Sequence, residues 1–468
     1  MIARGALARS RTRCGLLLFG IVAGVYVLSF SRDVGFWDYG ELQTVPYILG
    51  LAHTTGFPTE ILSGWLFSHL VAVGSVAFRI TLFCWLCGVG AALCCYAIAL
   101  ELGASAGIAV ACAAAYACMR LTWSHAASPD VVNETVLLSA ATLLCATVAH
   151  RTERRAGVGL AALLAGLSLG THATAIFALP TATLALLRRR RDVGTIALAA
   201  LFGIGVAAIV YGYLPLRSCA VERQRLDPTR SLGLPPGMPI WDWGGPCKPA
   251  DFIAVVTGRQ ANAGSGLRAY LNLRHYPQFF SFALTQLGSL PLGALLVAAA
   301  VLAFLAQPKA THRRTWVLFL PFVLVTPFAA GFGTESDVAR YYMLPGLCLW
   351  IQIAVGCTAL AQRASARRIP HLETAAIAAV AVLALAWLWQ SRDLFERRND
   401  RLGSTYVAGV IAATSDDGIL IAPWVDATPL AYAAYAEKSF GRRFVVFGDA
   451  AAFRRQIPRW AKTRAVYE

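Results

Sequence analysis

The stretch F-W-D-Y-G-E-L-Q-T-V-P-Y-I-L-G-L-A-H-T-T-G-F-P-T-E-I-L-S-G-W-L-F, residues 36–67, lies between the first hydrophobic segment of the chain and the second. Its two acids, Asp38 and Glu41, are spaced so that a helix would place both on one face. A turn follows, in which Gly56 and Pro58 break the helix. A charge in mid-membrane costs about 2.5–3.5 kcal/mol, so we expect both acids to face water or a polar cavity.

Helix capping is the alternative role for Asp38. The pattern Asp-x-x-Glu before an amphipathic run is also typical of a helix N-terminus, where the aspartate accepts a backbone N–H. The two roles are compatible, because a capping aspartate can also face a substrate.

The composition is that of a polytopic membrane protein. Of the 468 residues, 57% are hydrophobic and 14% are charged, whereas a soluble domain has about 25% charged residues. The net charge of +16 could suggest nucleic-acid binding. However, the arginines cluster in short loops between hydrophobic segments, which is the pattern of cytoplasmic loops. We therefore expect a lipid bilayer and no nucleic acid as partner.

Hydrophobic segments of spanning length predict about eleven transmembrane helices. They lie at residues 13–31, 79–101, 104–121, 131–150, 156–170, 172–187, 193–214, 283–306, 315–332, 340–362 and 372–390. The short pair 156–170 and 172–187 could instead form a re-entrant hairpin.

The loops alternate in charge, which predicts their sides. The N-terminal tail and every second loop are rich in arginine and lysine, so we expect a cytoplasmic N-terminus in an inner (cytoplasmic) membrane, with the first span acting as a signal anchor. The opposite, extracytoplasmic loops would be 32–78, 122–130, 215–282, 331–339 and the C-terminal tail.

The loops expected outside contain acids, arginines, histidines and aromatic residues at one membrane face. Beside Asp38 and Glu41 these are His53, His125, Asp130, Glu134, His172, Arg217, Trp243, Arg259, Gln260, Asp337, Arg340 and Tyr341. Each residue alone also has a purely structural explanation. For example, His172 could be a hydrogen-bonded residue of a hairpin, and Arg217 could be an anchor at the membrane interface. Because all of them face one compartment, we expect a binding site for a polar substrate with an anionic group.

Cysteine usage points to one disulfide and to no zinc site. Most of the twelve cysteines lie in the expected spans, where they act as small apolar residues. The pair Cys84-x-x-Cys87 has no second half that would complete a zinc site. Cys219 and Cys247 both lie in the long outer loop, and we predict that they form a disulfide on an oxidising side.

From about residue 391 the composition changes to that of a small soluble α/β domain, residues 391–468, after a membrane domain at 1–390. Helices are expected at 405–413 and 428–436, and strands at 419–422 and 443–447. No Gly-rich phosphate loop is present, so we expect no nucleotide there.

Six ordered motifs between residues 36 and 360 resemble glycosyltransferase family 117. They are D-Y-G-E-L…L-G-L-A-H-T-T-G-F-P (38–58), W-S-H-A…N-E-T (123–135), A-G-L-S-L-G-T-H-A-T (165–174), Y-L-P-L-R (213–217), W-D-W-G-G-P…V-T-G-R-Q (241–260) and S-D-V-A-R-Y-Y-M-L-P (336–345). Thr54-Thr55 stands where the family has Pro-Pro, and Ala173 where it has a second histidine. These departures leave the sugar and the acceptor open.

The resemblance implies an all-α bundle of the GT-C type with its active site at the outer face. Such enzymes move a sugar, mannose being one candidate, from a polyprenyl-phosphate donor to an acceptor hydroxyl of a protein, lipid or glycan, with inversion. Asp38 would be the general base and Glu41 would position it. The leaving phosphate would be bound by Arg217, Arg259 and Arg340, and His53 and His172 would bind phosphate or sugar. No cofactor is expected, although a divalent metal on Asp38, Glu41 and Glu134 is left open.

Two other classes of function are compatible with the sequence. A transporter or flippase of lipid-linked sugars would also need a polar mouth, but it would have ionisable groups at mid-membrane and often internal repeats. A non-catalytic assembly protein of the cell envelope would tolerate Asp38→Asn without loss of function.

Overall fold

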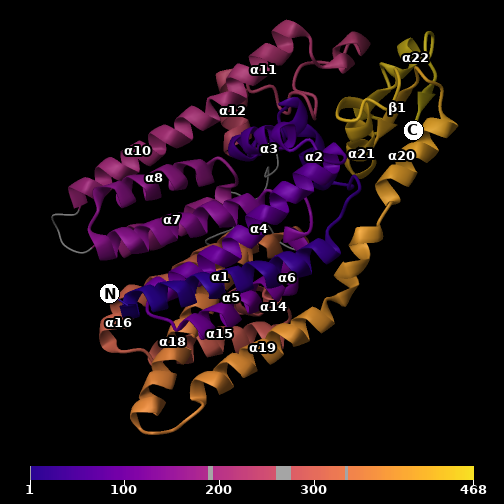
Figure 1. The fold of residues 1–468 in the computed structure, drawn as a ribbon. Coiled ribbons are helices and arrows are strands. Elements are labelled where there is room, and N and C mark those ends of the chain that lie inside the picture. Colours follow the sequence, from indigo (N-terminus) through magenta and orange to yellow (C-terminus); the bar gives the residue numbers. More distant parts are fainter. Residues whose placement is uncertain (1, 188–192, 260–275, 332–335) are drawn as a thin grey trace.

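The computed structural model describes residues 2–187, 193–259, 276–331 and 336–468, which form a long helical bundle with a small α/β domain at one end (Figure 1). The α-helices are α1 (Ile2–Ser29), α2 (Asp38–Ile48), α3 (Pro58–Leu70), α4 (Val76–Glu101), α5 (Ala106–Cys118), α6 (Arg120–Ala126), α7 (Val132–Thr152), α8 (Arg155–Leu169), α9 (Leu179–Leu186), α10 (Val193–Tyr211), α11 (Tyr213–Gln224), α12 (Pro249–Val256), α14 (Tyr276–Gln286), α15 (Leu290–Leu305), α16 (Lys309–Thr315), α17 (Leu320–Gly331), α18 (Met343–Ala366), α19 (Leu372–Gln390), α20 (Leu402–Ala413), α21 (Trp424–Tyr435) and α22 (Ile457–Trp460). The 3₁₀ helices are η1 (Ala173–Ala178), η3 (Pro228–Leu232), η5 (Trp316–Phe319), η6 (Ser336–Tyr342) and η7 (Arg392–Asn399).

Six helices in the described ranges are long and apolar enough to cross a membrane, or eight if each of two bent pairs is one span. The bent pairs are α5 with α6, at 68°, and α14 with α15, at 93°. The other expected spans fall on the shorter helices α8, η1 with α9, and η5 with α17. The all-α membrane fold is confirmed. Of the about eleven expected spans, six to eight have full spanning length in the described ranges, and the pair at 156–170 and 172–187 is short in the structure, as it is in the sequence.

The core of the bundle is built from small residues. Its buried side chains in α5 are largely alanine and cysteine, alanine is also common in α4 and α7, and α18 contributes larger apolar side chains. Small side chains let membrane helices approach closely. At Gly356 of α18, a Cβ atom would lie 2.2 Å from the carbonyl oxygen of Ala303 in α15, so that crossing requires glycine.

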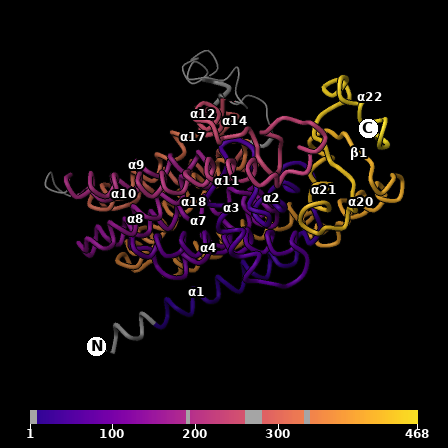
Figure 2. Tube along the Cα trace, turned by 90° about the horizontal axis from the view of Figure 1, so that it is seen from above, coloured from indigo at the N-terminus to yellow at the C-terminus, as the bar shows by residue number. Residues whose placement is uncertain are grey.

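Figure 1 shows the N-terminus, α16 and the turn between α18 and α19 toward one end of the bundle, and α2, α3 and the α/β domain at the opposite end. The view from above, in Figure 2, separates the two termini in the same way. The arginine-rich turns at 151–155 and 363–368 thus lie away from Asp38 and Glu41. The cytoplasmic placement of that end stays a prediction.

The C-terminal domain agrees with the sequence prediction. Its three parallel strands, β1 (Ile419–Ala422), β2 (Phe444–Phe447) and β3 (Val466–Tyr467), pair in the order β2-β1-β3. Ile419 is in register with Phe444 on one side and with Val466 on the other. The sequence analysis predicted β1, β2, α20 and α21, but not the short edge strand β3.

The C-terminal domain packs directly on α2. A Cβ atom at Gly40 would lie 2.9 Å from a backbone carbon of Thr428, so α21 can approach α2 this closely only at a glycine. On the other side of the site, a disulfide joins Cys219 of α11 to Cys247, with Cα atoms 4.9 Å apart. This is the pairing predicted from the sequence.

Candidate active site

Asp38 lies in the first turn of α2, at the end of the bundle covered by the C-terminal domain. The N-cap residue is Trp37, at φ 55°, and no side chain caps this end. Instead, Asp38 Oδ1 accepts a hydrogen bond of 3.0 Å from the indole Nε1 of Trp424. The capping alternative for Asp38 therefore does not describe its contacts, and one carboxylate oxygen, Oδ2, is left for other partners.

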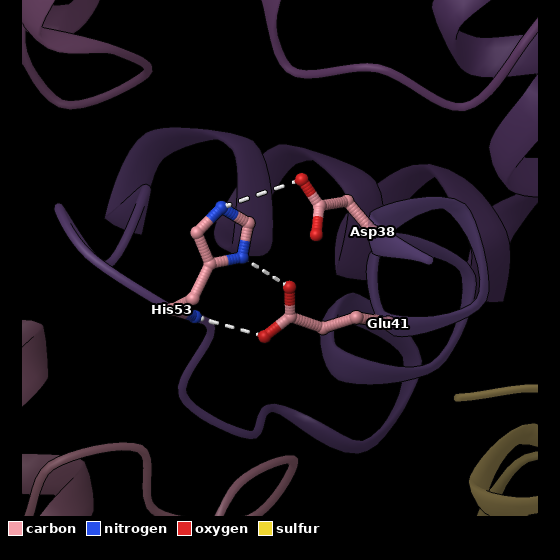
Figure 3. Close-up of side chains that lie close together, drawn as sticks. All are labelled: Asp38, Glu41 and His53. Atoms are coloured by element: carbon pink, nitrogen blue, oxygen red, sulfur yellow. Dashed lines mark hydrogen bonds and ion pairs between the residues drawn. The ribbon is translucent and has the colours of Figure 1, made fainter. Parts of the chain in front are cut away.

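His53 lies between the two acids of α2 (Figure 3). Glu41 is fully buried; its Oε1 accepts the backbone N–H of His53 at 2.8 Å, and its Oε2 makes a very short contact with Nδ1 of the same histidine. The other ring nitrogen, Nε2, lies 3.8 Å from Oδ2 of Asp38. Glu41 thus fixes the orientation of the imidazole, and the imidazole presents its free edge to Asp38.

The charge on His53 follows from this geometry. Burial alone would lower the pKa of His53, but the carboxylate of Glu41 outweighs burial and raises that pKa to about 9. Burial raises the pKa of Glu41, and the contact with His53 partly offsets this rise. At neutral pH the pair holds a proton on the imidazole, next to Asp38.

This pKa predicts how stability depends on pH. A histidine with a raised folded-state pKa contributes stability that is fully present below about pH 6.5 and is lost as the pH rises through about 9. The thermal midpoint of the native protein should exceed that of His53→Gln most at about pH 6, by the equivalent of roughly 1–3 kcal/mol, and the gap should close by about pH 10. A gap that stays constant across this range would show that the pKa of His53 is not raised in the folded protein.

Trp424 was not identified from the sequence, because it lies in the domain predicted to be separate. Its ring also packs edge-on against Trp243, at 5.1 Å between centroids, and against Phe447, at 5.1 Å. Trp243 in turn lies 5.9 Å from the ring of His53. The long outer loop and the C-terminal domain therefore form an aromatic wall beside the cluster of Asp38, Glu41 and His53.

Trp424→Phe tests whether the indole N–H orients Asp38. A hydrogen bond to a charged group contributes about 1.5–3 kcal/mol. If Asp38 is the general base that the resemblance implies, loss of this bond should lower the rate of sugar transfer by about tenfold or more. Phenylalanine keeps the ring packing, so the melting temperature should change little. Trp424→Ala, which also removes the ring, is the more severe comparison. If Trp424→Phe kept the native rate, the contact between Trp424 and Asp38 would serve packing alone.

A second polar cluster joins residues that are far apart in the sequence. Asp130 is buried; its Oδ2 contacts Nδ1 of His125 at 2.9 Å and Nη1 of Arg340 at 3.5 Å, and its Oδ1 accepts the N–H of Val132 at 3.0 Å. Burial would raise the pKa of Asp130, but Arg340 and these bonds hold it well below its usual range. Asp130 is thus a buried anion that positions Arg340 and His125.

A third cluster pairs Glu134 with Glu60, which the sequence analysis missed although it closes the motif G-F-P-T-E. Both glutamates are buried, and Ser63 donates a 3.0 Å hydrogen bond to Glu134. Burial and the neighbouring Glu134 raise the pKa of Glu60 well above its usual value. Glu134 therefore faces Glu60 rather than Asp38 and Glu41, which corrects the metal-binding set left open from the sequence.

Several other predicted residues hold the scaffold together. Arg217 donates from Nε and Nη2 to the carbonyls of Leu49 and Ile48, at the C-terminal end of α2, where a cation interacts favourably with the helix dipole. His172 caps η1 by accepting the N–H of Thr174 at 3.2 Å, and burial lowers its pKa to about 3. These bonds give both residues a structural role, and the expectation that Arg217 binds phosphate and that His172 binds phosphate or sugar stays a prediction.

The remaining predicted residues are less informative. Tyr341 packs against His172 at 5.3 Å and under the guanidinium of Arg340 at 5.9 Å. Arg259 is exposed after α12. Gln260 lies outside the described residues, as does the side chain of Asp337.

A cavity of about 620 Å³ opens beside Asp38, within the range of about 300–1,000 Å³ that is usual for ligand sites. Its lining comprises Ser31, Asp33, Val34, Gly35, Phe36, Trp37, Asp38, Tyr39, Gln43, Ser128, Pro129, Arg340, Arg397, Asp400 and Gly403. The cavity is thus lined by Asp38 and by two arginines, Arg340 and Arg397.

Asp38, Glu41 and His53 also have the spacing of a metal site. One ligand atom from each lies within 4.8 Å of the others, and a His–carboxylate pair behind a metal is a common arrangement. A cation here would take Nε2 of His53 and Oδ2 of Asp38, with Glu41 supporting the imidazole from behind.

Comparison with known proteins connects this site to a family. A family model described as the Protein O-mannosyl-transferase TMEM260 N-terminal domain matches residues 38–195. Residues 38–195 of this chain are therefore similar to that N-terminal domain. The match begins at Asp38 and contains three of the six motifs noted in the sequence, so it confirms the resemblance to an O-mannosyltransferase-like family for this part of the chain.

One curated relative is Protein O-mannosyl-transferase TMEM260 of Mus musculus, which is 32% identical over 169 residues. That alignment covers 35% of this chain and 24% of TMEM260, so the chain spans about a quarter of the length of this relative. Among solved structures, ArnT from Cupriavidus metallidurans in the apo state matches over 99% of this chain and 90% of its own, with 12% identity and a TM-score of 0.41.

Proposed function

We propose that this integral membrane protein is a glycosyltransferase that transfers a sugar, mannose first among the candidates, from a polyprenyl-phosphate donor to a hydroxyl group of a protein acceptor. The observation that carries the proposal is the cavity that Asp38 lines together with two arginines, Arg340 and Arg397. The name of the relative in the same family supports mannose and a protein acceptor.

The chemistry needs one base and one place for a leaving anion. Asp38 takes the proton from the acceptor hydroxyl through Oδ2 while that oxygen bonds to the anomeric carbon. The bond from the anomeric carbon to the phosphate oxygen breaks at the same time, and the polyprenyl phosphate leaves as an anion. Because attack and departure occur on opposite faces of the sugar, the product has the inverted configuration.

The surrounding residues prepare Asp38 for this step. Trp424 holds Oδ1, so Oδ2 is the oxygen available for the proton. Glu41 holds the imidazole of His53 against the same carboxylate. The site lies at the end of the bundle opposite the arginine-rich turns, which supports an extracytoplasmic active site and a cytoplasmic N-terminus.

Proteoliposomes that contain the full chain test the proposal. Radiolabelled polyprenyl-phosphate mannose is the donor, with polyprenyl-phosphate glucose in parallel and a peptide library as acceptor. Label in peptide, released as the inverted glycoside, is the expected result. Movement of the labelled lipid across the bilayer without transfer would assign the protein to transport instead.

A further inference from the structure

The cavity beside Asp38 is lined by an arginine that the sequence analysis assigned to the separate C-terminal region. Arg397 lies in η7, directly after the last long helix, and Arg340 lies in η6. The two guanidinium groups reach one cavity from elements that are far apart in the sequence.

Arg397 is held in place by neutral partners. Its Nη1 donates to the carbonyl oxygen of Ser124 at 2.7 Å and to the hydroxyl of Ser128 at 2.8 Å. Within the described ranges no carboxylate forms an ion pair with it, and the nearby Asp393 pairs with Arg120 instead. A half-buried cation of this kind is costly unless an anion compensates it.

Arg340 lies on the other side of the same short loop. Arg397 contacts Ser128, and Arg340 contacts Asp130 two residues later. Ser128 and Pro129 themselves line the cavity. Both arginines therefore contact the loop at residues 128–130, and both line the same cavity.

Two of the three acids in the cavity are used elsewhere. Oδ2 of Asp33 accepts from the backbone N–H and the hydroxyl of Ser404, both at 3.0 Å, and Oδ1 of Asp400 accepts the N–H of Leu402 at 2.9 Å. These bonds satisfy the first turn of α20, as N-terminal acids commonly do. Asp38 remains as the acid placed for chemistry.

We infer that Arg397, together with Arg340, binds the phosphate of a phosphate ester in this cavity, next to Asp38. The inference deepens the proposed function, on which it rests, by naming the group that receives the leaving phosphate. A guanidinium suits this task because its fork of N–H donors matches two phosphate oxygens. The residue comes from the segment after the membrane bundle, so that segment is part of the site.

The test is a binding measurement that needs no turnover. Undecaprenyl phosphate is titrated into the full chain in detergent and followed by microscale thermophoresis, with inorganic phosphate as a second arm. Arg397→Gln is the main variant, because glutamine can still donate to Ser124 and Ser128 but has no charge. Arg398→Ala is the matched control, since Arg398 is exposed and does not line the cavity.

Arg397→Gln should weaken binding of undecaprenyl phosphate by about ten- to a hundredfold, because hydrogen bonds to a charged group are lost. Arg398→Ala should bind undecaprenyl phosphate as tightly as the native chain does. The melting temperature of Arg397→Gln without ligand should stay close to that of the native chain. If inorganic phosphate bound as tightly as undecaprenyl phosphate, and this binding also depended on Arg397, the ligand of the site would be free phosphate.

Two results would overturn these ideas, and they are distinguishable. Full affinity of Arg397→Gln for undecaprenyl phosphate would exclude Arg397 from the site and leave the proposed function in place. A native chain that binds neither probe would overturn the phosphate site and the proposed donor together.

Discussion

Asp38→Asn should lower sugar transfer by about 10²–10⁴-fold, the usual contribution of a general base. Asparagine has nearly the same shape as aspartate, and its amide oxygen can still accept the hydrogen bond from Trp424. It cannot take the proton of the acceptor hydroxyl. The measurement is the initial rate of label transfer in proteoliposomes, with protein amount and melting temperature matched.

Asp393→Asn is the control for that experiment. Asp393 is an exposed acid whose partner is Arg120, and exposed ion pairs contribute only about 0–1 kcal/mol. Its rate should equal that of the native protein. If Asp38→Asn also retained the native rate, the proton would have to go to another group and the proposed mechanism would be wrong.

Arg340→Leu should destabilise the protein by about 3–5 kcal/mol, because breaking a buried ion pair leaves an uncompensated charge. The charge left behind is that of Asp130, which is buried. His125 is the other charge partner of Asp130 and would compensate only in part. Denaturant or thermal unfolding of the detergent-solubilised chain measures the loss.

The double variant Asp130→Asn with Arg340→Leu separates charge from packing. Removing the charge of Asp130 as well should restore a large part of the stability lost in Arg340→Leu. The packing of the Arg340 side chain would still be missing in the double variant. Equal stabilities of the single and the double variant would mean that Asp130 is not the reason Arg340 matters to the fold.

Local features of this structure followed from the sequence. Asp38, Glu41 and His53 come from one stretch of sixteen residues, and a helix followed by a turn is enough to bring them together. The strands β1 and β2 and the helices around them could be predicted from the sequence, because each is a short apolar run between residues that break secondary structure. The apolar segments were also found, including the short pair at 156–170 and 172–187, which falls on α8 and on η1 with α9. Hydropathy did not show the bends between α5 and α6 and between α14 and α15.

Long-range features did not follow from the sequence. Trp424 reaches Asp38 from 386 residues away, and Arg340 reaches Asp130 from 210 residues away. No periodicity encodes such pairs. The contacts of Arg217 with the carbonyls of Leu49 and Ile48 were missed for a related reason: the sequence shows that an arginine is present but does not show which acceptors it reaches.

The crosslink between Cys219 and Cys247 has a consequence for where this protein can work. The 28-residue segment that it closes contains Trp243, which packs between His53 and Trp424. In a reducing compartment the two thiols would stay apart and nothing covalent would anchor the aromatic wall. Reduction of the crosslink should therefore loosen the loop that carries Trp243, and with it the aromatic wall beside Asp38.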